Sequence, residues 1–185
     1  MIKKLLTICI LLVGTTAYGA NSLQVEKLFN EGKALCNLYQ KQCNFTVVNY
    51  EGMVAQTRYG GEISLSSGII KAMNEEQLRG VLFHEVGHVV FRHIEIKGDH
   101  YYTCMKNHDC NQEYISNMKR EHEYQADRFS TYVCKYGNMR CDLIGALLTL
   151  TPPKDLNKTH DSHPSTIDRI NAIYKILNED FIYGK

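Results

Sequence analysis

Neither sign of charge is in excess in this 185-residue sequence: Lys and Arg total 21, and Asp and Glu total 20. Without a basic surplus the chain cannot be a protein that coats nucleic acid, and no nucleic-acid partner is expected. Tryptophan, internal repeats and low-complexity tracts are also absent. With 44% hydrophobic and 22% charged residues, the composition excludes a disordered chain and is typical of one globular domain.

Long apolar runs are missing as well, except at the N-terminus. The apolar segment 5–13 follows a short basic stretch, and Ala17 and Gly19 place small residues before a cleavage site. This pattern predicts a signal peptide over residues 1–19, cleaved after residue 19 or 20. The alternative, an uncleaved membrane anchor, would need about 20 apolar residues.

Removal of this segment leaves residues 20–185 as a single, nearly neutral domain with 19 basic and 20 acidic residues. No second apolar run in it is long enough for a transmembrane helix. A lipoprotein signal at Cys9 is the weaker alternative, because this cysteine lies inside the apolar segment. The predicted location is the periplasm or the extracellular space, where disulfides persist.

Six cysteines remain once Cys9 is removed, an even number that fits a disulfide framework. They fall into three local couples: Cys36 with Cys43, Cys104 with Cys110, and Cys134 with Cys141. The alternative, cysteine ligands for a structural zinc, needs C-x-x-C spacings, which are absent. We therefore predict three structural disulfides.

Hydrophobic periodicity predicts an α+β fold in which helices are the majority. Helices are expected over residues 22–41, 74–96, 111–136, 142–150 and 164–177. The helix at 74–96 has the clearest boundaries, because Asn74 and Gln77 can form a capping box and Gly98 can stop the helix.

Three short segments predict a small sheet. Residues 45–50 and 53–59 are rich in β-branched and aromatic side chains and flank Glu51-Gly52, which is typical of a hairpin. The strand Glu62–Ser66 alternates polar and apolar residues, the pattern of a strand with one buried face and one wet face. We expect it at the edge of an antiparallel sheet beside the helix at 74–96.

That helix contains His84-Glu85-Val86-Gly87-His88, an H-E-x-x-H motif. Side chains at i and i+4 lie on one helix face, so His84 and His88 can bind one metal ion. Glu85 points elsewhere and can hold a water beside that metal. The alternative, two surface histidines on an amphipathic helix, fits poorly with the apolar neighbours of the motif.

A catalytic zinc needs a third protein ligand and an open fourth position. The candidates for the third ligand are Glu121, His122, Glu123, Asp127, His160 and His163. Glu123 and Asp127 share a helix face with the small residues Ala126 and Ser130, whereas Glu121 lies on the other side of the helix. We favour Glu123 as ligand and Asp127 as the acceptor that orients a ligand imidazole. Two solvated acids on an exposed helix are the alternative.

Four strings of the sequence together resemble the HtpX-type and CAAX-prenyl-protease-type zinc metallopeptidases, and most closely their small periplasmic members. The strings are Ser64-Leu65-Ser66-Ser67-Gly68-Ile69-Ile70, the H-E-x-x-H motif, Glu123-Tyr124-Gln125-Ala126-Asp127, and His163-Pro164 followed by Arg169-Ile170. The resemblance covers residues 60–177. It implies a zincin-like (gluzincin) fold, one zinc ion per chain, Glu123 as third ligand and His163 near the metal. The membrane helices of the family and its usual spacing around Cys104 to Cys110 are not matched.

The expected function is that of a zinc endopeptidase acting on exported or misfolded proteins. Zinc would polarise the scissile carbonyl and lower the pKa of a water to about 7, and Glu85 would move the proton to the leaving amine. An extended protein or peptide substrate is expected to pair with the strand Glu62–Ser66. The alternatives are a metal-bound periplasmic chaperone or adaptor with little proteolysis, and a disulfide-stapled binding module with a structural metal.

His163 is the candidate whose role the spacing leaves open. Pro164 biases it away from helical geometry, so its ring is expected at a helix entrance. It can either occupy the open position on the metal or stabilise the developing oxyanion, or it can simply cap the helix.

Overall fold

We describe a computed structural model of the chain over residues 22–160 and 163–183. The predicted signal peptide, residues 1–19, lies outside these residues. The helices are α1 (Ser22–Leu38), α2 (Ser67–Ala72), α3 (Glu75–Val90), α4 (His93–Asn107), α5 (Gln112–Tyr136), α6 (Leu143–Leu150) and α7 (Thr166–Tyr183). The strands are β1 (Asn44–Val48), β2 (Ala55–Arg58) and β3 (Glu62–Ser66), with 3-10 turns at Tyr59–Gly61 and Pro153–Asp155. The expected α+β class with a helical majority is confirmed.

The three strands form one mixed sheet in the order β1-β3-β2. β1 runs parallel to β3, and β2 runs antiparallel to it. The expected hairpin and the purely antiparallel sheet are therefore wrong. The loop between β1 and β2 is held by the start of α2 instead: the Ser66 hydroxyl donates to the Gly52 carbonyl at 2.6 Å, and the Ser67 hydroxyl donates to the Tyr50 carbonyl at 2.9 Å.

β3 is the central strand, so its expected place at the sheet edge is also wrong. Both of its faces are buried: Ile63 and Leu65 are 1% exposed, and Ser64 and Ser66 are 7% and 0% exposed. Among the polar positions that suggested a wet face, only Glu62 is exposed, and the two serines are buried. The Ser66 hydroxyl caps α2 by accepting a hydrogen bond from the Ile69 amide.

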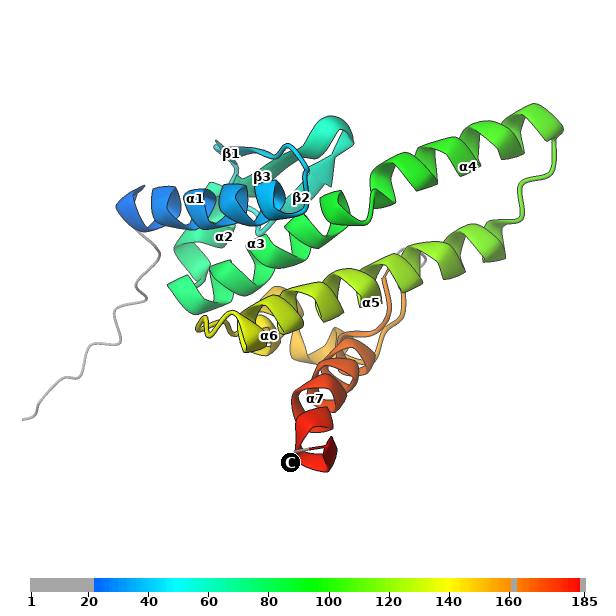
Figure 1. The fold of residues 1–185 in the computed structure, drawn as a ribbon. Helices are drawn as coiled ribbons and strands as arrows, with labels where there is room; N and C mark the ends of the chain where they lie inside the picture. Colours follow the sequence, from blue (N-terminus) through cyan, green and yellow to red (C-terminus); the bar gives the residue numbers. More distant parts are fainter. Residues whose placement is uncertain (1–21, 161–162, 184–185) are drawn as a thin grey trace, which may run out of the picture.

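α3 is the central helix of the molecule. It packs against α1 and β2 on one side and against α5 and α6 on the other (Figure 1). The capping box between Asn74 and Gln77 is present. Small residues bring α5 close to it, as expected: Ala126 is fully buried, and the Ser130 hydroxyl donates to the Gly80 carbonyl at 2.8 Å. Within the described ranges, no helix has both the length and the apolar character that crossing a membrane requires.

The helix expected over 74–96 is broken in two. α3 ends at Val90, Arg92 adopts a left-handed conformation (φ 58°), and α4 begins at His93 and continues through Gly98. Gly98 therefore does not stop a helix. α4 and the start of α5 form a helical hairpin that stands away from the rest of the molecule, and we call residues 93–118 the arm (Figure 1).

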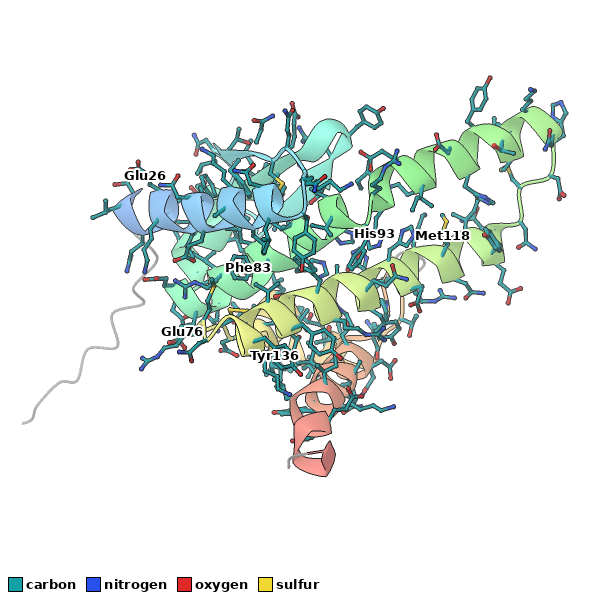
Figure 2. All side chains as sticks on the ribbon, viewed as in Figure 1. Glu26, Glu76, Phe83, His93, Met118 and Tyr136 are labelled. Atoms are coloured by element: carbon teal, nitrogen blue, oxygen red, sulfur yellow. A yellow bond between two sulfur atoms is a disulfide. The ribbon has the colours of Figure 1, made fainter. Side chains whose placement is uncertain are left out.

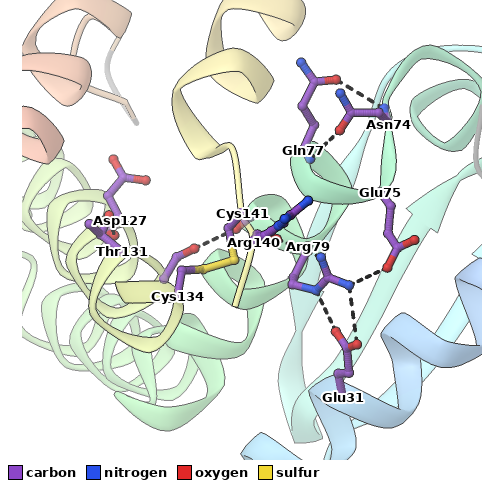
Figure 3. The surroundings of a disulfide bond; sticks show 12 residues. Glu31, Asn74, Glu75, Gln77, Arg79, Asp127, Thr131, Cys134, Arg140 and Cys141 are labelled. Carbon is purple, nitrogen blue, oxygen red and sulfur yellow. Dashed lines mark hydrogen bonds and ion pairs between the residues drawn. A yellow bond between two sulfur atoms is a disulfide. The ribbon is translucent and has the colours of Figure 1, made fainter. Parts of the chain in front are cut away.

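The three local disulfides form as predicted. Cys36–Cys43 joins α1 to the segment before β1, Cys104–Cys110 closes the tip of the arm, and Cys134–Cys141 joins the end of α5 to the segment before α6. Figure 3 shows the last of these beside the buried Arg79, whose guanidinium is paired with Glu31 and Glu75.

Candidate metal centre

The histidines of the H-E-x-x-H motif and Glu123 meet between α3 and α5. The Nε2 atoms of His84 and His88 are 3.1 Å apart, and each lies 3.5 Å from an oxygen of the Glu123 carboxylate. Their side chains are 8%, 11% and 11% exposed. One turn of helix separates the two histidines, so the regular geometry of α3 is sufficient to align their ligand nitrogens.

The second ring nitrogen of His84 is held by Asp127, one turn after Glu123 on α5. His84 Nδ1 lies 2.8 Å from Asp127 Oδ1. Arg169 of α7 donates to both oxygens of the same carboxylate, at 2.7 Å each. Burial raises the pKa of Asp127, but Arg169 and His84 outweigh it and hold this pKa below its usual value. Asp127 is therefore ionised and accepts the Nδ1 proton of His84.

The carboxylates of Asp127 and Glu123 determine the charge of the two histidines. Burial alone would lower the pKa of His84, but its hydrogen bonds to Asp127 and Glu123 raise this pKa to about 10. Burial and the neighbouring His84 lower the pKa of His88 well below its usual value, so its imidazole is neutral. The acids thus favour a positive charge at the point where the two Nε2 atoms converge.

Glu85 lies beside this point and is 7% exposed. Thr57 of β2 donates a hydrogen bond from Oγ1 to Glu85 Oε2 at 2.7 Å. Burial raises the pKa of the Glu85 carboxyl, against the opposing effects of His84 and Thr57. A carboxylate with a raised pKa is a better proton acceptor than one in water.

A cleft of about 720 Å³ opens onto the centre. Its walls come from β2 with the preceding residues, from α3, from the base of the arm, and from Lys158, His160 and His163. His163 is 52% exposed, and its Nε2 lies 3.7 Å from Glu123 Oε1. Burial lowers the pKa of His163, partly offset by Glu123.

Three of the other ligand candidates, Glu121, His122 and His160, do not join His84, His88 and Glu123. Glu121 is exposed and accepts a hydrogen bond from the Gln125 amide at 3.3 Å. The ring of His122 stacks on His93, with centroids 4.0 Å apart, on the side of α5 that faces the arm. His160 lines the cleft without joining the group formed by His84, His88 and Glu123.

The described part of the chain contains one group of His, Cys, Asp and Glu side chains able to hold a metal, namely His84, His88 and Glu123. A family model for Peptidase family M48 matches residues 20–106 and 105–177. The chain belongs to Peptidase family M48. The resemblance drawn from the motifs is thereby confirmed at the level of the family, which consists of zinc-dependent peptidases. No curated protein matches the chain significantly.

The residues of this M48 peptidase fit a zinc ion. Two histidines and one glutamate form a known donor set for catalytic zinc. Ligands bound at about 2.0–2.1 Å around a tetrahedral ion lie a little more than about 3 Å apart, as the two Nε2 atoms do. The other ring nitrogen of each histidine is already engaged, so both Nε2 atoms are directed toward Glu123.

Four side chains around the centre of the M48 peptidase carry no role in the sequence-based interpretation. Thr57 hydrogen-bonds to Glu85, and Arg169 hydrogen-bonds to Asp127. His93 contacts His88 and is itself bound by Gln125. Arg169 is part of the family-like string, which was the only signal for it. Gln125 also lies in one of these strings, between Glu123 and Asp127. No motif contains Thr57 or His93, and only tertiary packing brings them to the centre.

Proposed function

We propose that this M48 peptidase is an exported zinc endopeptidase. The observation that supports it best is the convergence of His84, His88 and Glu123 at the floor of an open cleft, with the buried Glu85 beside them. A purely structural zinc site is closed by four protein ligands. Here a cleft leads to the three ligand side chains, as a substrate requires.

In this proposal His84, His88 and Glu123 hold the zinc. When bound, zinc polarises the scissile carbonyl and lowers the pKa of a water molecule to about 7. Glu85 then accepts the proton of the attacking water and returns it to the leaving nitrogen. Thr57 keeps the Glu85 carboxylate in one orientation through its 2.7 Å hydrogen bond.

The substrate is proposed to bind along β2 rather than β3. β3 has strands on both sides, so the Glu62–Ser66 strand that was expected to receive the substrate has no open edge. β2 has β3 on one side only, and its residues Ala55, Gln56 and Thr57 line the cleft. An extended peptide can add to such an edge through main-chain hydrogen bonds. The proposed substrate class is therefore an extended or locally unfolded segment of protein.

His163 is proposed to assist the reaction from the wall of the cleft. It is half exposed and lies 3.7 Å from Glu123, so its ring can reach a substrate bound at the centre. Its position is suited to donating a hydrogen bond to a developing oxyanion. If it instead blocks the site in the resting enzyme, His163→Ala will raise activity rather than lower kcat.

Export is supported by the three disulfides of the described chain and by the predicted signal peptide. The periplasm or the extracellular space would give the enzyme extended or misfolded exported proteins as substrates. The chaperone or adaptor alternative requires a centre that binds metal without hydrolysing peptides.

The test compares the mature wild-type protein with Glu85→Gln and with Glu76→Gln, the same substitution at an exposed position of α3. Zinc content is measured by elemental analysis, and proteolysis is measured on casein. We expect about one zinc per chain in all three proteins and a loss of activity of about 10²- to 10⁴-fold in Glu85→Gln alone.

The same assay on His163→Ala should show a lower kcat at unchanged zinc content. Zinc-loaded wild-type protein without proteolysis of any unfolded substrate would support the chaperone alternative. Unchanged turnover in Glu85→Gln would exclude the proposed mechanism.

A further inference from the structure

His93 is buried at the base of the arm, where α4 begins beside α3 and α5, and Figure 2 labels it there. It is 2% exposed. Its Nδ1 lies 2.9 Å from His88 Nδ1, and its Nε2 lies 3.0 Å from Gln125 Oε1. One face of its ring is covered by His122. His93 is thus in contact with a ligand side chain of the centre.

The partners of His93 determine where its proton lies. Gln125 donates its amide to Glu121 Oε1, so its carbonyl oxygen faces His93 and can only accept. His93 therefore carries its proton on Nε2, and its Nδ1 is an acceptor. The proton between the two rings then belongs to His88 Nδ1. In that tautomer His88 Nε2 has a free lone pair, which is the form that binds a metal.

The backbone is shaped to make this contact. In an uninterrupted helix, positions five residues apart differ by about 140° around the axis, so the rings of His88 and His93 would diverge. The left-handed Arg92 breaks the helix between them and returns His93 toward His88. Steric repulsion from Cβ makes this conformation uncommon for residues other than glycine.

We propose that His93 is a positioning residue for the metal centre. It fixes His88 as the Nδ1–H tautomer with Nε2 directed at the metal, and Gln125 in turn fixes His93. The inference rests on the proposed function, because it assumes that His88 is a zinc ligand. The two histidines would then be oriented differently, His84 by the carboxylate of Asp127 and His88 by a neutral imidazole.

The test measures the zinc dissociation constant of the mature protein by competition with a chromogenic chelator. His93→Leu removes the acceptor, His93→Asn keeps an acceptor oxygen near the position of Nδ1, and His100→Leu makes the same change two turns further along α4. We expect zinc to bind about 10- to 100-fold more weakly to His93→Leu. His93→Asn should restore most of this affinity, and His100→Leu should bind zinc like the wild type.

A spectroscopic readout separates positioning from simple packing. In the zinc-loaded, ¹⁵N-labelled protein, His88 should show a proton bound to Nδ1 that exchanges slowly with water. It should exchange faster in His93→Leu and stay slow in His93→Asn. A role in packing alone would lower the melting temperature of both variants without this difference between them.

A second variant covers the case in which His93→Leu does not fold. Gln125→Leu leaves the His93 ring in place but removes its anchor, and it should weaken zinc binding several-fold. Wild-type affinity in His93→Leu, or in Gln125→Leu where the former is unfolded, would overturn the inference while leaving the proposed function intact. A wild-type protein that binds no zinc would overturn both.

Discussion

Arg169 connects the last helix of the protein to the metal centre. Its guanidinium makes two hydrogen bonds with Asp127, and the two side chains are 11% and 2% exposed. A buried ion pair adds little net stability compared with apolar side chains, but removal of one partner leaves a buried charge without compensation. The pair therefore makes the packing of α7 depend on the same carboxylate that orients His84.

The first prediction concerns this pair. Arg169→Met should lower the free energy of unfolding by about 3–5 kcal/mol, because the buried Asp127 loses the cation that most strongly stabilises its charge. Urea denaturation of the metal-free protein measures the change. The double variant Asp127→Asn with Arg169→Met should regain part of the loss, since the buried charge is then gone. A loss of less than about 1 kcal/mol in the single variant would mean that His84 alone compensates Asp127.

The second prediction distinguishes the two glutamates near the centre. Glu123→Gln should weaken zinc binding by more than about tenfold, because a neutral amide replaces a charged ligand. Glu121→Gln is the matched control, since Glu121 is exposed, lies two residues away on the same helix, and a glutamine there keeps an acceptor oxygen for the Gln125 amide. Zinc competition titrations on both variants give the comparison. The opposite order of affinities would show that the wrong carboxylate was assigned.

Much of the centre could be predicted at this scale because its spacing is local. His84 and His88, like Glu123 and Asp127, are separated by one helical turn, and one turn places two side chains on the same face. Arg169 lies 42 residues after Asp127, so no periodicity relates them. The role of His93 was not predicted for another reason. Its contact with His88 exists because the helix predicted over 74–96 is broken at Arg92.

The break between α3 and α4 is the main feature of the elements that sequence patterns did not reveal. Apolar residues continue with helical period from Leu78 to Ile96, so the pattern predicts one helix. In the structure Ile96 is 46% exposed and the chain turns at Arg92. The mixed sheet was also not predicted, because a strand pattern does not indicate which other strand it pairs with. In the structure β3 lies between β1 and β2. Element type was predictable for most of the chain, but α2 and residues 97–107 of α4 were not predicted as helix. Element boundaries and strand pairing required tertiary contacts.

The third prediction tests the conformation of Arg92. Arg92→Val should lower the free energy of unfolding by about 1–2 kcal/mol, because a β-branched residue is strongly disfavoured in the left-handed region. Arg92→Gly should keep or raise stability, since glycine adopts this conformation without a steric cost. Arg128→Val, at an exposed position of α5, is the control and should cost only the difference in helix propensity, about 0.5 kcal/mol. Equal losses for Val and Gly at position 92 would contradict the assigned conformation.

At the scale of the whole molecule, the arm is distinct from the other described residues, which we call the body. The body contains the disulfides Cys36–Cys43 and Cys134–Cys141. Arg79 pairs with Glu31 of α1 and donates to the Arg140 carbonyl at 2.7 Å, next to the Cys134–Cys141 disulfide (Figure 3). These contacts tie α1, α3 and the end of α5 together. The arm has only Cys104–Cys110 at its tip, and the two matches to the family model meet at residues 105–106 within it.

The last prediction follows from this division. Cys134→Ala with Cys141→Ala should lower the free energy of unfolding by about 2–3 kcal/mol, because the disulfide closes a short loop between two helices that both pack on α3. Cys104→Ala with Cys110→Ala should leave both the unfolding transition and zinc affinity unchanged. Its effect should be confined to faster hydrogen exchange at the tip of the arm, where local opening does not require the body to unfold.

Peptide mapping without reduction should first confirm the three local pairings in the wild type, and urea denaturation and hydrogen exchange then compare the variants. A cross-pair between the couples would contradict the assigned connectivity. An equal loss of stability in the Cys104 and Cys110 variant would show that the arm and the body unfold as one unit.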